Sequence, residues 1–177
     1  MPSYLQIENI SKSYGPKVLF EHIDFNINEG DKVALIAPNG TGKTSLLRIL
    51  AGKDGSDSGG KVLFLKDICI AFLEQEYAHD QEKGIFRQIM DSSTQWTEHL
   101  DQDHLWQYEL RVHQLLTQFG LTDPDKRMKD LSGGEVKRVA LTQMLASEAD
   151  FYIMDEPTNH LYIDAIEFLE NHLKHSR

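Results

Sequence analysis

The spacing of apolar and polar positions alternates between strand-like and helix-like patterns along this chain. Alternation is plain over residues 4–10, while the largely apolar run at 32–37 is typical of a buried strand. Strands are predicted at residues 4–10, 18–28, 32–37, 61–65, 67–73 and 151–156. Helical segments separate them, and this order of elements predicts an α/β fold.

Helical periodicity governs residues 85–119, where apolar residues recur at intervals of three and four. The predicted buried stripe is Leu100, Leu105, Tyr108, Val112, Leu115, Leu116 and Phe119. Trp106 is predicted to belong to the core rather than to a base-stacking surface. Two further helices are expected, at 136–147 and at 163–173, the second with Ile163, Ile166, Leu169 and Leu173 on one face.

A glycine-rich turn follows the apolar run at 32–37 and leads into a helix. Its sequence, Ala-Pro-Asn-Gly-Thr-Gly-Lys-Thr from 37 to 44, fits a phosphate loop except that Ala37 replaces the first glycine. Alanine would strain the turn if this position required positive φ. The backbone N–H groups of residues 39–44 and Lys43 would surround a triphosphate, while the Thr44 hydroxyl would reach Mg²⁺. The alternative is an ordinary strand-to-helix turn.

A second apolar strand, 151–156, finishes in two carboxylates, Asp155 and Glu156. Adjacent residues at a strand end point in different directions, so one carboxylate can serve a metal while the other orients a water molecule. Alone, the pair could equally be a solvated strand end. Together with the phosphate loop, it predicts a site for phosphoryl transfer.

The stretch Leu131-Ser132-Gly133-Gly134-Glu135 has the spacing of a helix capping box, with Ser132 and Glu135 as its two members. Two interpretations remain open from spacing alone. The stretch can be no more than a well-capped helix start. It can also be a second anion site, because glycines and a serine lie at a helix N-terminus.

These motifs resemble the ATP-binding cassette superfamily, in which Leu-Ser-Gly-Gly-Glu is the signature. The run Asp155-Glu156-Pro-Thr-Asn-His-Leu161 is similar to the F subfamily, especially its Uup-like branch. The resemblance implies a P-loop NTPase cassette with a mixed or parallel core sheet, an antiparallel β subdomain and a helical subdomain. It implies one cassette over 1–177, incomplete at its C-terminus, with 1–74 and 148–177 as core and 76–147 as the helical subdomain.

The resemblance also implies roles for individual residues. Gln75 and Glu156 would be catalytic, with Glu156 as the base, and Mg²⁺ would be held by Thr44, Gln75 and Asp155. Tyr14 would stack on adenine. The ATP-binding set would be Tyr14, Asn39, Gly40, Thr41, Gly42, Lys43, Thr44 and Ser45, with Ser132, Gly133, Gly134 and Glu135 contacting ATP held by a second cassette.

Several positions depart from the family pattern. Tyr162 replaces the aspartate expected after Asn-His-Leu, and the chain stops at Arg177, before the histidine that contacts the γ-phosphate. Only residues 76–130 separate Gln75 from the signature, so the helical arm of this branch is expected to be deleted or very short. An isolated chain is therefore expected to be a weak ATPase.

Composition narrows the function classes. The formal net charge is -10, and residues 74–109 hold nine acidic and two basic side chains, which argues against direct nucleic-acid binding. Cys69 is the only cysteine, and no signal peptide or membrane-length apolar run is seen, so a cytoplasmic location is expected.

The leading hypothesis is ATP binding and hydrolysis by a soluble F-type cassette protein acting around the ribosome. Its expected partners are a second cassette, in cis or by self-pairing, and the ribosome in a full-length protein, with no membrane contact. The alternatives are the nucleotide-binding subunit of a membrane transporter and a non-catalytic remnant that binds ATP.

Overall fold

The computed structural model describes residues 3–175, which form two compact units. The first, here called the strand unit, comprises the chain up to Phe72 together with Asp150–Asp155. The second, the helical unit, comprises Leu73–Ala149 and the segment that begins at Glu156. Residues 156–175 thus group with the helices rather than with the phosphate loop, whereas the sequence analysis assigned them to the core.

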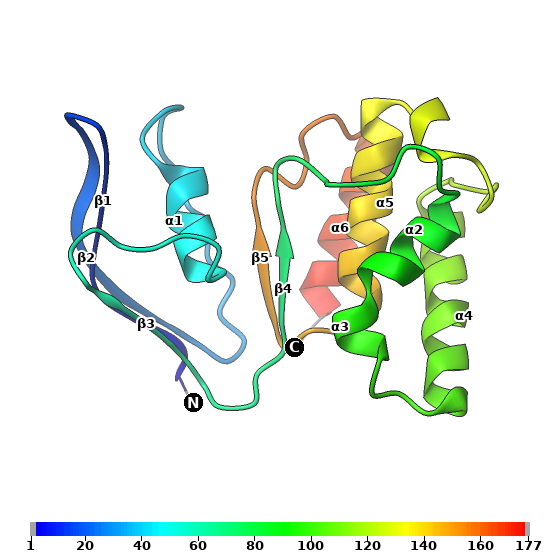
Figure 1. Ribbon diagram of the computed structural model, residues 1–177, viewed down its shortest axis with the longest axis horizontal. Coiled ribbons are helices and arrows are strands. Elements are labelled where there is room, and N and C mark those ends of the chain that lie inside the picture. Colours follow the sequence, from blue (N-terminus) through cyan, green and yellow to red (C-terminus); the bar gives the residue numbers. More distant parts are fainter. Residues whose placement is uncertain (1–2, 176–177) are drawn as a thin grey trace. The chain divides into compact units, whose positions relative to one another are not determined.

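An antiparallel sheet forms one side of the strand unit (Figure 1). Strands β1 (Ser3–Tyr14), β2 (Lys17–Asn28) and β3 (Lys61–Phe64) lie in the order β2-β1-β3. The register between β1 and β2 shifts at several points, and Asn9 and His22 adopt positive φ beside two of them. The prediction of strands at 4–10, 18–28 and 61–65 is confirmed, and β1 and β2 extend beyond the expected limits.

The rest of the strand unit is helix α1 (Lys43–Leu50) and a two-stranded sheet of β4 (Ile70–Leu73) and β5 (Phe151–Met154). β4 and β5 run in the same direction in Figure 1. The Asp150 carboxylate accepts a hydrogen bond from the Cys69 amide at 2.9 Å, which fixes where the two strands start. The buried core cluster comes from β1, β2, α1 and β5 and consists of Leu5, Ile7, Ile10, Ile27, Leu46, Ile49, Leu50 and Ile153. Partly buried side chains of β3 and β4 pack against it: Val62, Phe64, Ile70 and Phe72.

The helical unit contains α2 (Ile85–Ser92), α3 (Thr94–Thr97), α4 (Gln102–Gln118), a 3-10 turn (Met128–Asp130), α5 (Gly133–Ala146) and α6 (Ile163–His175). Its core consists of apolar side chains of α2, α4, α5, α6 and the 3-10 turn, and Phe168 of α6 meets Phe119 edge to face with ring centroids 4.8 Å apart. Within residues 3–175, no helix is both long and apolar enough to cross a membrane.

The buried strand predicted at 32–37 does not form. Residues 31–38 carry no regular secondary structure, and the Ile36 side chain is 91% exposed. An apolar segment becomes a strand only where a neighbouring strand offers its hydrogen-bonding edge. In the described part of the chain, neither sheet includes this segment as a member.

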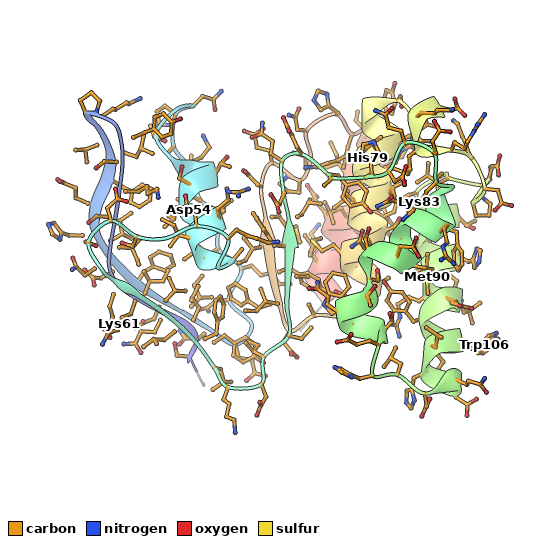
Figure 2. All side chains as sticks on the ribbon, viewed as in Figure 1. Asp54, Lys61, His79, Lys83, Met90 and Trp106 are labelled. Atoms are coloured by element: carbon orange, nitrogen blue, oxygen red, sulfur yellow. The ribbon has the colours of Figure 1, made fainter. Side chains whose placement is uncertain are left out.

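The predicted buried stripe of the long helical region is largely correct, but Leu100 and Trp106 of this region and Ile163 of the last predicted helix are exposed. Trp106 is 63% exposed, and Figure 2 shows it on the outer side of α4. It lies two residues before the buried Tyr108, about 200° around the helix, and therefore on the opposite face. Leu100 and Ile163 are exposed because one precedes α4, which the Asp101 side chain caps, and the other is the first residue of α6.

Candidate functional site

The phosphate loop, residues 37–44, has the backbone curl that its glycines predicted. Gly40 and Gly42 have φ values of 76° and 98°, in the region that favours glycine, and Gly42 is the N-cap of α1. Ala37 is absent from the positive-φ residues, so alanine at the first position causes no strain of that kind. The first N–H groups of α1 lack partners within the helix, as at any helix start.

The Lys43 side chain forms hydrogen bonds to residues of its own loop. Its ammonium group donates to the carbonyl oxygens of Ala37 and Pro38, at 2.8 and 3.1 Å, and lies 3.3 Å from Oδ1 of Asn39. All three acceptors are neutral. A triphosphate would offer this ammonium group charged oxygens in their place, which form stronger hydrogen bonds.

The hairpin between β1 and β2 packs directly over the phosphate loop. A Cβ atom on Gly42 would lie 2.9 Å from Cβ of Leu19 and 3.1 Å from the Phe20 ring, so only glycine fits there. The Lys17 ammonium group donates to the Gly40 carbonyl at 3.0 Å. Tyr14, at the other end of the hairpin turn, is 82% exposed and offers an open aromatic face. The strand unit therefore brings Tyr14 and the phosphate loop together.

Asp155 follows β5 directly and is 2% exposed. The Ile153 side chain on the same strand packs in the core cluster that contains Leu46, Ile49 and Leu50 of α1. The strand that carries Asp155 is thus fixed against the helix that the phosphate loop begins. A buried carboxylate in the same unit as Lys43 and Thr44 has the chemistry of a magnesium ligand.

Other predicted site residues lie in the helical unit, where three segments line a recess of about 210 Å³. The lining residues are Gln75, Glu76, Tyr77, Gly133, Val136, Lys137, Glu156, Asn159 and His160. Gln75 and Glu156 therefore share one cavity with the start of the signature helix. Glu156 adopts φ of 46°, and its carboxylate accepts a hydrogen bond from the Asn159 side-chain amide at 3.3 Å.

The signature forms the predicted capping box at the start of α5. The Ser132 hydroxyl accepts from the Glu135 amide at 3.3 Å, and the Ser132 amide donates to the Glu135 carboxylate at 2.8 Å. Lys126 donates to the other carboxylate oxygen at 2.8 Å. Together, the Lys126 hydrogen bond and the Ser132 amide lower the pKa of Glu135 to about 2.

The predicted site residues are thus divided between the units. Tyr14, residues 39–45 and Asp155 belong to the strand unit, while Gln75, the signature and Glu156 belong to the helical unit. Sequence reasoning missed Lys17, which contacts Gly40, and Lys137, which lines the recess. The glycine and proline at 15 and 16 indicate a turn before Lys17, but no sequence signal indicates the contact with Gly40. Among the described residues, no group of three or more His, Cys, Asp or Glu side chains is placed to hold a metal by itself.

Comparison with known proteins agrees with this geometry. The family model described as "ABC transporter" matches residues 20–159. The chain is 33% identical to the ABC transporter ATP-binding protein YfmR of Bacillus subtilis, over 97% of the chain and 32% of that protein. It is 30% identical to the ATP-binding protein Uup of Escherichia coli, over 92% of the chain and 30% of Uup. It is 29% identical to the energy-dependent translational throttle protein EttA of Mycobacterium tuberculosis, over 94% of the chain and 35% of EttA.

Solved structures show the same fold. An ATP-binding subunit of an ABC transporter superposes with a TM-score of 0.82 at 22% identity, covering 98% of this chain and 74% of that one. The chain belongs to the ATP-binding cassette family, and its similarity to Uup, EttA and F family members of Arabidopsis thaliana places it with the F subfamily. It spans about a third of the length of these curated relatives.

Proposed function

We propose that this chain binds Mg-ATP through its phosphate loop and hydrolyses it. The observation that carries the proposal is the loop itself, where Gly40 and Gly42 adopt left-handed backbone conformations and the Lys43 ammonium group lies across the loop on neutral acceptors. Residues 39–45 would contact the phosphates, and the exposed ring of Tyr14 would stack on adenine.

Each remaining residue has a proposed role. Thr44, Gln75 and Asp155 would hold Mg²⁺, which when bound neutralises charge on the phosphates. Glu156 would orient the attacking water and accept its proton. The recess that Glu156 and Gln75 line, and the hydrogen bond from Asn159 to Glu156, support this role.

Calorimetry with Lys43→Ala tests the binding step. We expect the affinity for Mg-ATP to fall at least tenfold, because a charge-assisted phosphate contact is lost. Lys66→Ala is the matched control, since Lys66 is an exposed lysine of the same unit with 90% of its side chain accessible. Equal ATP affinity in wild type and Lys43→Ala would show that the phosphate loop is wrongly assigned.

The cellular role proposed is that of a soluble F-type cassette in the cytoplasm, associated with translation. The name of EttA, a translational throttle protein, and the similarity to Uup support this reading. The alternative of a transporter subunit rests on solved structures that share 22–24% of residues, a likeness that supports the fold alone.

A second cassette is the proposed partner, and the ribosome is the proposed partner of a longer protein. The signature residues 132–135 would contact ATP held by that second cassette. This chain carries one phosphate loop and one signature, so we expect the chain alone to turn over ATP well below the ordinary enzyme range of about 1 per second. A steady-state assay checks this: turnover at or above that rate, lost in Glu156→Gln, would contradict it.

A further inference from the structure

Lys17 is a charged side chain of the hairpin that contacts the phosphate loop. Its ammonium group donates to the Gly40 carbonyl at 3.0 Å, and β2 touches the same loop again where Leu19 and Phe20 crowd Gly42. The strand that begins at Lys17 thus contacts the loop at two adjacent points. Lys17 itself is exposed, and its ammonium group lies against the loop backbone.

The charge of Lys17 is not neutralised by the protein. Within residues 3–175, neither Lys17 nor Lys43 forms an ion pair, and both ammonium groups bond only to neutral oxygens. Lys12, further back on the same hairpin, contrasts with them because it forms ion pairs with Asp54 and Asp57, at 3.0 and 3.7 Å. Two uncompensated cations, Lys43 of the loop and Lys17 of the hairpin, thus contact the backbone of one loop, which favours a polyanionic ligand.

The position of Lys17 relative to Tyr14 indicates which part of a nucleotide it would meet. The two residues pair across the ends of the turn formed by Gly15 and Pro16. Lys17 therefore adjoins Tyr14 on one side and contacts the phosphate loop on the other, so a nucleotide with its base on Tyr14 and its terminal phosphates on Lys43 would have its phosphate chain near Lys17. An ammonium group has three donors, so two remain for phosphate oxygens while the third holds Gly40.

We propose that Lys17 is a second phosphate-binding lysine of this site, which contacts the phosphate chain of the nucleotide while it anchors the Gly40 carbonyl. The inference rests on the proposed function, because it assumes that the loop binds a nucleoside polyphosphate. The inference assigns phosphate binding to Lys17, which lies outside the phosphate-loop motif and belongs to the β1–β2 hairpin.

The test is calorimetric binding of ATP, ADP and adenosine to the wild-type chain, Lys17→Met, Lys17→Arg and Lys66→Met. Methionine keeps most of the side-chain length but removes the charge, arginine keeps the charge, and Lys66 supplies an exposed lysine elsewhere in the strand unit. We expect Lys17→Met to weaken ATP binding about tenfold or more and to reduce its salt dependence. Adenosine binding should stay unchanged, Lys17→Arg should recover most of the affinity, and Lys66→Met should match wild type.

Two results would overturn the inference. Equal ATP affinity in wild type and Lys17→Met would show that the ammonium group does not contact the phosphates. An equal loss for adenosine and ATP, with a lower melting temperature of the nucleotide-free chain, would show that Lys17 only supports the loop. If the wild-type chain binds no ATP, the proposed function itself fails, and that outcome is distinct from both.

Discussion

Two adjacent glycines of the signature differ in their surroundings. A Cβ atom on Gly134 would lie 2.6 Å from the His160 carbonyl oxygen, whereas one on Gly133 would meet nothing within 4 Å. Backbone cannot yield as a flexible side chain can, so Gly134→Ala should destabilise the helical unit by about 1–3 kcal/mol. It should also displace the segment that forms one wall of the recess.

Gly133→Ala is the matched control, one residue away on the same helix turn. Because alanine is the better helix former, this variant should melt at the same temperature as wild type or slightly higher. Thermal unfolding followed by circular dichroism measures both. If the two variants melt alike, the contact between α5 and His160 is not as close as the structure has it.

The sequence predicted which residue types form the site better than it predicted which face of an element each residue occupies. The glycines of the phosphate loop and the capping pair Ser132 and Glu135 determine the local backbone conformation. A few neighbouring residues in the sequence are enough to predict it. Trp106 was assigned to the core although it lies on the face opposite Tyr108. Its face depends on which turn of α4 packs on α5, and that is a tertiary choice.

At the scale of elements, the start of α5 has a pH-dependent stability. Glu135 has a pKa of about 2 in the folded chain, below its ordinary value of 4.5, mainly because Lys126 donates to it. A lowered carboxyl pKa adds stability that is complete above about pH 4.5 and is lost as the pH falls from there through about 2.

Glu135→Gln separates the charge from the hydrogen bond, because glutamine can still complete a capping box. We expect a loss of about 1 kcal/mol at pH 7 that disappears as the pH falls toward 2. Urea unfolding at pH 7, 4.5 and 3 measures it. Glu135→Ala, which removes both interactions, should cost more at pH 7, and a loss that persists unchanged at pH 3 would contradict the assignment.

A buried hydroxyl pair joins α4 to the end of α2. The Tyr108 hydroxyl donates to the Ser93 hydroxyl at 2.7 Å, and both residues are almost fully buried. Tyr108→Phe would leave Ser93 without this donor and should cost about 1–3 kcal/mol. Tyr162→Phe, at a tyrosine that is 79% exposed, should leave stability unchanged. The double variant Tyr108→Phe with Ser93→Ala should recover part of the loss, and full additivity would argue against the pair.

Elements with strong local signals were predictable, and those that depend on partners were not. β1, β2 and α5 follow from alternation, a turn and a capping box, all contained in short windows. The segment 32–37 has the same apolar character as a strand, but pairing depends on a second segment that supplies hydrogen bonds. Sequence alone cannot tell whether such a partner is in place.

At the scale of the whole molecule, the ion pairs determine which carboxylates of the acidic stretch 74–109 have a basic partner. Residues 74–109 contain only two basic side chains, Lys83 and Arg87, and both are held by Asp91, at 2.8 and 3.0 Å. The two cations of this stretch are therefore already paired with a carboxylate of the same stretch. Glu82 pairs with Lys129 and Arg127, which lie outside it, at 2.8 and 3.6 Å. Among the described residues, Asp103 and Glu109 on α4 have no lysine or arginine partner.

This arrangement predicts that the chain does not bind ribosomal RNA by itself, because affinity for nucleic acid comes largely from neutralised phosphates. Co-sedimentation with ribosomes at low salt should leave the chain in the supernatant. Replacing Glu98, Asp103 and Glu109 with lysine should create weak binding that falls steeply with added salt, whereas glutamine and asparagine at the same positions should create less. Salt-sensitive co-sedimentation of the wild-type chain, lost when residues in 74–109 are changed, would instead show that this acidic stretch contacts the ribosome, through protein rather than RNA.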